Sequence, residues 1–195
     1  MSVARPLTLV DVAAPRSSML LNTLIVVVAS LVTAAAAQVE IRLPWTPVPI
    51  TGQSFAVLLS GLVLGARRAF LAQVLYLAEG AAGLPFFAGG AAGAVQLVGP
   101  TGGYLLAFPL AAAFTGLLAE RGWDRNPFTM FAAMLSGSAI VFALGLAQLS
   151  RFVPADALLA SGLLPFIPGD LVKSAIAAGV FPLVWKLVPR SGDSA

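Results

Sequence analysis

The sequence contains no cysteine and no histidine. The absence of cysteine excludes disulfides, zinc–thiolate sites and a thiol nucleophile. The absence of histidine removes the commonest general base, the Ser–His–Asp arrangement and most transition-metal ligand sets. We therefore expect a protein that is not an enzyme and that carries no metal or cofactor of its own.

Charged residues are also scarce, at 10% of the 195 residues, whereas hydrophobic residues make up 59%. Soluble domains are usually about 45–50% apolar, and the mean hydropathy of this chain is +0.96. The net charge of +3 is compatible with nucleic-acid binding, but the basic residues are scattered between apolar runs and form no patch. The composition predicts a polytopic protein surrounded by membrane lipid, with no nucleic-acid partner.

Six apolar segments are expected to cross the membrane as helices, although several are shorter than the ~20 residues that a ~30 Å hydrocarbon core requires. They cover residues 19–37, 52–64, 69–84, 104–119, 128–149 and 171–188. This pattern predicts an all-α fold with a single transmembrane domain over residues 19–188, an N-terminal tail of residues 1–18 and a C-terminal tail of residues 189–195. A secretory signal peptide is the alternative for the first segment, because Arg16 precedes the apolar run and alanines end it. The long polar leader and the membrane-like remainder of the chain favour a span.

The basic residues indicate how the segments are oriented. If both termini are cytoplasmic, the inner segments carry eight of the eleven Lys and Arg residues, in agreement with the positive-inside rule. The inner set is Arg5, Arg16, Arg67, Arg68, Arg121, Arg125, Lys186 and Arg190, and the outer set is Arg42, Arg151 and Lys173. The bias supports six spans with both termini in the cytoplasm.

Four Pro- and Gly-rich connections fall on the outer side in this topology. They are residues 44–51, 83–90, 99–104 and 165–170. Irregular backbone at membrane depth is tolerated only where protein or water satisfies its polar groups. We therefore expect these connections to form the walls and lid of a pocket that opens to the outside.

Asp170 and Lys173 are the leading candidates for that pocket. An ionisable residue at membrane depth marks a substrate or ion site by default, and residues at i and i+3 share one face of a helix. Pro168 and Gly169 stand just before them, where backbone N–H groups are free at a helix start. The alternative is a structural ion pair, which is rarely a net stabiliser when it is buried.

Further polar and aromatic residues near the outer side are candidates for the same pocket. Gln53 directly follows a Pro-rich connection and is expected to face the pocket. Glu79 lies at the outer end of the third segment, where its alternative role is to reach water at the interface. The aromatic candidates are Trp45, Phe86, Phe87 and Tyr104. Such residues either pack on an apolar or ring-shaped ligand or belong to the aromatic belt of the membrane interface.

Ala29, Thr33 and Ala37 form a row of small residues on one face of the first segment. Such a row lets another helix approach closely. The spacing alone leaves open whether that neighbour belongs to this chain or to a partner subunit.

Five sequence motifs follow one another along the chain. They are Pro47-Val48-Pro49-Ile50-Thr51-x-Gln53, Gly61-x3-Gly65-x-Arg67-Arg68, Gly83-Leu84-Pro85-x-Phe87-Ala88-Gly89, Gly99-Pro100-Thr101-Gly102-Gly103-Tyr104 and Pro168-Gly169-Asp170-Leu171-x-Lys173. In these motifs and their order, over about residues 20–188, the chain resembles the BioY family. BioY proteins are the biotin-specific substrate-binding (S) components of energy-coupling factor (ECF) transporters. Two residues depart from the family pattern. The family often has a larger apolar residue in place of Gly52 and an apolar residue in place of Glu79. Both departures are expected to reshape the pocket locally.

The resemblance implies a six-helix ECF S-component fold with a high-affinity biotin site near the outer face. It also implies a partner module made of a transmembrane T subunit and two cytoplasmic ATPase subunits. Small residues on the first helix are the family's usual docking face for the T subunit, which implies that role for Ala29 and Thr33. Family members also occur without such a module, so the alternative is a chain that works alone or as a homo-oligomer.

We therefore expect the chain to take part in biotin uptake across the cytoplasmic membrane of a bacterium or archaeon. One alternative is a self-sufficient secondary transporter or channel for another small solute. A second is an intramembrane enzyme, which the missing histidine and cysteine disfavour.

Biotin offers a ureido ring with N–H donors and a carbonyl, an apolar thiophane ring and a valerate carboxylate. Asp170 and Lys173 carry over from the last motif of the family. Asp170 is expected to bind the ureido N–H groups, and Lys173 to bind either the ureido carbonyl or the carboxylate. Gln53 and Tyr104 are expected to supply neutral hydrogen bonds. The residues expected to pack on the apolar parts are Trp45, Phe86 and Phe87.

Overall fold

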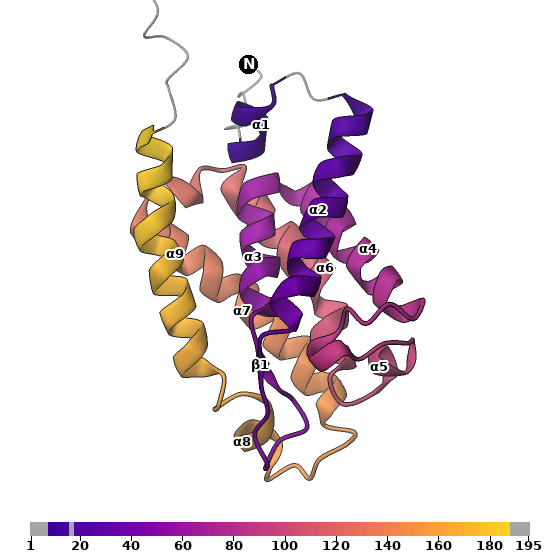
Figure 1. The fold of residues 1–195 in the computed structure, drawn as a ribbon. Coiled ribbons are helices and arrows are strands. Elements are labelled where there is room, and N and C mark those ends of the chain that lie inside the picture. Colours follow the sequence, from indigo (N-terminus) through magenta and orange to yellow (C-terminus); the bar gives the residue numbers. More distant parts are fainter. Residues whose placement is uncertain (1–7, 16–17, 188–195) are drawn as a thin grey trace, which may run out of the picture.

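The computed structural model describes residues 8–15 and 18–187 of the chain. This part contains the helices α1 Leu9–Ala13, α2 Met19–Ala37, α3 Gln53–Leu64, α4 Ala66–Ala81, α5 Val95–Val98, α6 Gly102–Ala119, α7 Pro127–Leu149, α8 Leu158–Gly162 and α9 Ile167–Leu187 (Figure 1). It also contains the strands β1 Glu40–Ile41 and β2 Ile50–Thr51, and short 3-10 turns at Ala88–Gly90 and Trp123–Arg125. The predicted C-terminal tail, and residues 1–7 and 16–17 of the predicted N-terminal tail, lie outside the described residues.

Capping and helix-breaking residues set the ends of the long helices. The Ser18 hydroxyl accepts a hydrogen bond from the Leu21 N–H at 3.2 Å at the start of α2. Asn126 caps α7 in a similar way, and Pro127 is the first residue of that helix. Gly65 ends α3 with a φ of 80°, a conformation that favours glycine. The chain therefore turns from α3 into α4 within one residue.

Helix α6 lies at the centre of the bundle, where it packs against α3, α4 and α7 (Figure 1). Helix α2 covers α4 and α3 on one side, and α9 packs on α7 on the other. A Cβ added at Gly61 of α3 would clash with the Thr115 hydroxyl of α6, so glycine allows these two helices to approach closely. Large apolar side chains are exposed along α2 and α9, which suits a bundle surrounded by lipid.

Four segments within the described residues are long and apolar enough to cross a membrane. They are Met19–Ala37, Gly102–Ala119, Pro127–Leu149 and Leu158–Leu187. Helices α3, with 12 residues, and α4, with 16 residues, are shorter, although each occupies the place of a predicted segment. An all-α membrane architecture is confirmed.

The structure contains short elements that the sequence analysis did not predict. Strands β1 and β2 pair antiparallel, with Glu40 opposite Thr51 and Ile41 opposite Ile50. Helices α5 and α8 lie between predicted membrane segments, and α1 lies within the predicted N-terminal tail. Elements of two to five residues carry no sustained hydrophobic period by which a sequence would reveal them.

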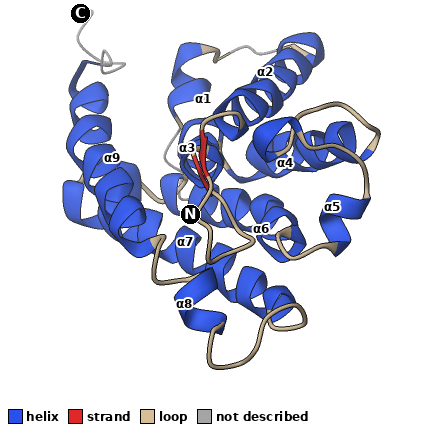
Figure 2. Ribbon diagram, turned by 60° about the horizontal axis from the view of Figure 1, so that its bottom comes forward, coloured by secondary structure: helices blue, strands red, loops and turns tan. Residues whose placement is uncertain are grey.

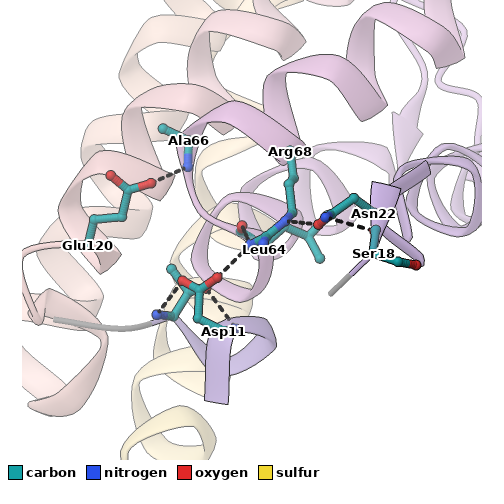
Figure 3. A network of polar contacts seen from close by, with 8 residues as sticks. Asp11, Ser18, Asn22, Leu64, Ala66, Arg68 and Glu120 are labelled. Atoms are coloured by element: carbon teal, nitrogen blue, oxygen red, sulfur yellow. Dashed lines mark hydrogen bonds and ion pairs between the residues drawn. The ribbon is translucent and has the colours of Figure 1, made fainter. Parts of the chain in front are cut away.

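Polar contacts hold the α1 end of the bundle together (Figure 3). Arg68 of α4 forms an ion pair with Asp11 of α1 at 2.7 Å, and its Nε donates to Asn22 Oδ1 of α2 at 2.8 Å. Glu120, at the end of α6, accepts a hydrogen bond from the Ala66 N–H of α4 at 2.8 Å. These contacts tie four helices together at the end that the charge bias assigns to the cytoplasm.

The same end of the bundle also anchors α9. Asp124, fully buried in the connection between α6 and α7, accepts a hydrogen bond from Trp185 Nε1 at 2.6 Å. The Arg125 guanidinium lies 4.4 Å from the centre of the Trp185 ring, within cation–π range. Burial raises the pKa of the Asp124 carboxyl above its usual value, despite the opposing effects of Trp185 and Arg125. Helix α9 is thereby held at the end opposite to Asp170.

We expect Asp11→Asn to lower the free energy of unfolding at pH 7 by ~1 kcal/mol, because it removes one charge from a partly buried ion pair. Burial by itself raises the pKa of Asp11, but hydrogen bonds from Arg68 and Thr8 outweigh it and hold the pKa below the usual 3.8. The stabilisation is therefore complete above the unfolded-state pKa and is lost as the pH falls through the folded-state pKa.

Thermal unfolding of the detergent-solubilised protein at pH 7 and at about pH 3 measures this difference. The control is Arg67→Gln, which changes the exposed neighbour of Arg68 and should have little effect at either pH. A deficit for Asp11→Asn that is equal at both pH values would contradict a stabilising role for the Asp11 charge.

Candidate ligand-binding site

A cavity of about 550 Å³ lies at the end of the bundle opposite α1. Residues of the β1–β2 hairpin, of the loop after α4 and of helices α3, α6, α7 and α9 line it. Figure 2 turns this end forward and shows the strands near the centre, with α9, α8 and α5 around them. All four Pro- and Gly-rich connections contribute lining residues, as the sequence analysis predicted.

Asp170 and Lys173 line this cavity from the first two turns of α9. The helix begins at Ile167, four residues earlier than predicted, so both side chains project from regular helix. Ser138 of α7 donates a hydrogen bond to Asp170 Oδ1 at 2.6 Å. Lys173 Nζ donates to the Thr51 carbonyl of β2 at 2.8 Å. The acid and the base are thus each held by a different neighbouring element.

Asp170 and Lys173 form no ion pair with each other, although both belong to the described part of the chain. The alternative of a structural ion pair therefore does not describe this site. The two opposite charges attract each other electrostatically without direct contact and face one cavity, one as a hydrogen-bond acceptor and the other as a donor. Such a pair is able to bind a ligand that presents a donor and an acceptor side by side.

Gln53 lines the cavity from the first turn of α3, and its side chain is 5% exposed. Its amide nitrogen donates to the Tyr76 hydroxyl of α4, and its amide oxygen accepts from the Thr51 hydroxyl at 3.2 Å. The Tyr76 hydroxyl in turn donates to the Phe86 carbonyl at 3.1 Å. Gln53 thereby connects the hairpin to α4 and the following loop, a connection through Tyr76 that the sequence analysis did not identify.

The predicted aromatic residues differ in where they lie. Phe87 is buried, lines the cavity and packs edge-on against Tyr76, with ring centroids 5.6 Å apart. The Phe86 side chain and Trp45 do not belong to the lining, and Trp45 is 64% exposed. Only Phe87 of these three is therefore placed to contact a ligand in the cavity, because neighbouring residues in a turn point in different directions.

Tyr104 lines the cavity from the start of α6, but its hydroxyl donates to the buried Gly162 carbonyl of α8 at 2.7 Å. A Cβ added at Gly145 of α7 would clash with the Tyr104 ring, so the ring fills a space that glycine leaves open. The expected hydrogen bond from this hydroxyl to a ligand competes with the bond to Gly162. Tyr104 contributes its ring to the wall and holds α8 against α6.

Glu79 lies outside the cavity lining, on the last turn of α4. One of its carboxylate oxygens is buried and has no hydrogen-bond partner among the described residues. Its position therefore does not support a direct contact with a ligand in this cavity.

Thr33 is fully buried inside the bundle, and its hydroxyl accepts a hydrogen bond from Gln73 of α4 at 3.2 Å. Ala29 is partly buried and packs against the same core. The row of small residues thus faces a helix of this chain, which answers the question that the spacing left open. In this conformation the Thr33 side chain is not available as a docking surface for a partner subunit.

The cavity contains a second pair of charges that the sequence analysis did not include in the site. Arg42 and Glu40, both on or beside β1, line the cavity and form an ion pair at 2.8 Å. Gly89 packs so closely against this pair that a Cβ there would clash with both side chains. The alternation of polar and apolar residues from 38 to 43 is a sign of a strand and would have placed Glu40 and Arg42 on one face. No comparable signal marks Ser138.

The sequence matches the BioY family over residues 11–190. The chain belongs to the BioY family. It is 41% identical over 145 residues to a probable biotin transporter BioY of Pyrococcus horikoshii, a match that covers 74% of this chain and 84% of that protein. It is 43% identical over 140 residues to the biotin transporter BioY of Thermotoga maritima, covering 71% and 81% respectively. A crystal structure described as the S-component for biotin from an ECF-type ABC transporter shares 26% identity at a TM-score of 0.75, covering 87% of this chain and 95% of that chain.

Membership of the BioY family confirms the resemblance that the five motifs indicated. The relatives are described as transporters, which also confirms the prediction of a membrane transport protein rather than an enzyme. They come from an archaeon and a bacterium. The fold is that of a multi-pass membrane protein with an S-component architecture.

We expect Tyr104→Phe to lower the free energy of unfolding by about 1–3 kcal/mol, because the Gly162 carbonyl is then buried without its donor. Denaturant-induced unfolding in detergent measures this loss. Ser136→Ala is the control, since the Ser136 hydroxyl bonds to the Ala133 carbonyl of its own helix. Equal stabilities of Tyr104→Phe and the unmodified protein would show that the hydroxyl does not hold α8.

Proposed function

We propose that this BioY-family chain binds biotin in the outer cavity and takes part in biotin uptake across the cytoplasmic membrane of a bacterium or archaeon. The names of its relatives support the ligand, since they are described as biotin transporters or as an S-component for biotin. The cavity volume of about 550 Å³ falls within the ~300–1,000 Å³ usual for small-molecule sites.

The observation that carries the proposal is the separate anchoring of Asp170 and Lys173. Because Ser138 and the Thr51 carbonyl hold them individually, an acceptor and a donor face the cavity side by side. The ureido ring of biotin carries N–H donors beside a carbonyl acceptor and is complementary to this pair. In the proposed complex Asp170 accepts from a ureido N–H and Lys173 donates to the ureido carbonyl.

The other parts of biotin then have natural partners along the cavity. Phe87, Phe108 and Phe142 supply apolar wall for the thiophane ring. Arg42, which belongs to the second charged pair of the lining, is the proposed partner of the valerate carboxylate. Biotin would then lie with one polar end at α9 and the other at β1.

We further propose that α2, α3, α4, α6, α7 and α9 are the six spans, with both termini in the cytoplasm. Helix α3 has 12 residues and is therefore about 18 Å long, so the hairpin that precedes it completes the crossing while lining the cavity. Irregular backbone is tolerated at that depth where it lines a cavity. The exposed Arg67 and Lys186 lie at the α1 ends of α4 and α9, and the exposed Arg121 lies in the turn just after α6. This placement supports a cytoplasmic location for that end.

The proposed partners are a transmembrane T subunit and two ATPase subunits, which would supply the energy for uptake by hydrolysing ATP. The description of the matching crystal structure as part of an ECF-type ABC transporter supports such a module. Action alone or as a homo-oligomer is the alternative, and co-purification from the native membrane would distinguish the two.

We expect Asp170→Asn to weaken biotin binding by about tenfold or more, since a hydrogen bond to a charged group contributes ~1.5–3 kcal/mol. Calorimetric titration of the purified protein with biotin tests this. Asp156→Asn is the matched control, because Asp156 is exposed and lies outside the cavity lining. Wild-type affinity in a folded Asp170→Asn protein would remove Asp170 from the site, and no biotin binding by the unmodified chain would refute the proposed function.

We expect Arg42→Gln to weaken binding of biotin about three- to tenfold but to leave binding of biotin methyl ester nearly unchanged, because only the free acid carries the carboxylate. Lys173→Gln should weaken both ligands alike. Glu40→Gln serves as the control, since it frees Arg42 from its ion pair and should not weaken binding of the acid. If Lys173→Gln instead discriminates between acid and ester, biotin lies in the opposite orientation.

A further inference from the structure

The hydrogen bond made by Ser138 differs from those of other serines in the helices. Serine hydroxyls in helices commonly bond back to a carbonyl of their own helix. In this structure Ser30 bonds to the Val27 carbonyl, Ser60 to the Val57 carbonyl, Ser136 to the Ala133 carbonyl and Ser161 to the Ala157 carbonyl. Ser138 instead donates across the helix interface to Asp170 Oδ1. A serine hydroxyl has one proton to donate, so this proton is committed to Asp170.

The geometry of this contact is that of a strong hydrogen bond. The oxygen–oxygen distance is 2.6 Å, within the range typical of a hydroxyl that donates to a carboxylate. Ser138 is 3% exposed and lies on α7, which packs along α9. Water therefore competes little for the Ser138 hydroxyl, and the backbone of α7 holds this hydroxyl in place.

Only one oxygen of the Asp170 carboxylate is occupied in this way. Oδ2 makes no hydrogen bond within the described part of the chain, and it is not among the enclosed atoms that lack a partner. Because Asp170 lines the cavity, Oδ2 is the oxygen open to it. Lys173 makes no hydrogen bond to this oxygen within the described part of the chain; one of its three donors bonds to the Thr51 carbonyl.

We infer that Ser138 is a positioning residue for ligand binding: it fixes the Asp170 carboxylate by Oδ1 so that Oδ2 accepts the N–H group of the ligand. The inference rests on the proposed function, in which that N–H belongs to the ureido ring of biotin. A carboxylate held in its binding orientation loses less conformational freedom when the ligand arrives. Ser138 thus acts on the ligand through Asp170 and not by the contact of its own proton.

The test is calorimetric titration with biotin of Ser138→Ala, Ser138→Thr and Ser136→Ala, each in the unmodified chain. Ser138→Ala is also made in the Asp170→Ala background, because an asparagine at position 170 would still accept the Ser138 hydrogen bond. Ser136 lies on the same helix two residues away, bonds within α7 and is absent from the cavity lining, so its variant is the matched control. Unfolding in detergent is measured for every variant, which separates a loss of binding from a loss of folded protein.

We expect Ser138→Ala to weaken biotin binding about three- to tenfold, and Ser138→Thr, which keeps the hydroxyl, to bind within about twofold of the unmodified chain. Ser136→Ala should bind as the unmodified chain does. In the Asp170→Ala background Ser138→Ala should cause no further loss, because its effect passes through the carboxylate. A merely structural serine would weaken binding equally in both backgrounds.

Wild-type affinity in Ser138→Ala, or an equal loss with and without the Asp170 carboxylate, would overturn the inference and leave biotin binding by the chain intact. A failure of the unmodified chain to bind biotin would overturn the proposed function and this inference together. The two failures are therefore distinguishable in one set of titrations.

Discussion

The cost of placing a charge in apolar surroundings governs this structure. A charged group away from water requires a hydrogen-bonding partner, and a chain that is 59% hydrophobic offers few such partners. Three of these partnerships join segments that are distant in sequence. Asp170 bonds to Ser138, Lys173 to the Thr51 carbonyl, and Arg68 to Asp11. Close approach at small residues allows the helices to pack, and these polar contacts determine which faces meet.

The two ends of the bundle satisfy this requirement differently. At the α1 end the charges are compensated within the protein, as in the Arg68–Asp11 ion pair and the bond from Trp185 to Asp124. At the other end, Asp170 and Lys173 each keep hydrogen-bonding capacity directed at the cavity. A ligand with both a donor and an acceptor completes the compensation there. The cost of an uncompensated charge is thus met by protein contacts at the α1 end, whereas at the cavity end it favours binding of a polar ligand.

Helix α9 connects the two ends. Its first turns carry Asp170 and Lys173, and its last turn carries Trp185, bonded to the buried Asp124. Most of the surface between these points is apolar and exposed, so α7 and the polar contacts at its ends hold the helix in place. The contacts at both ends of α9 therefore pre-organise the binding site that it carries. The proposed role of Ser138, which fixes the Asp170 carboxylate, is one of these contacts.

The sequence by itself determined the membrane class and the positions of the long helices. It also placed Asp170, Lys173, Gln53 and Phe87 near a cavity. Hydrophobic segments, charges and the Pro and Gly residues that end helices are local properties of the chain, so the sequence reveals them. It could not determine that Trp45, Phe86 and Glu79 lie outside the lining, or that Thr33 faces α4. It also gave no indication of Ser138, whose importance depends on a residue 32 positions away. Side-chain direction and long-range partners follow from how the helices pack, and only the tertiary structure decides them.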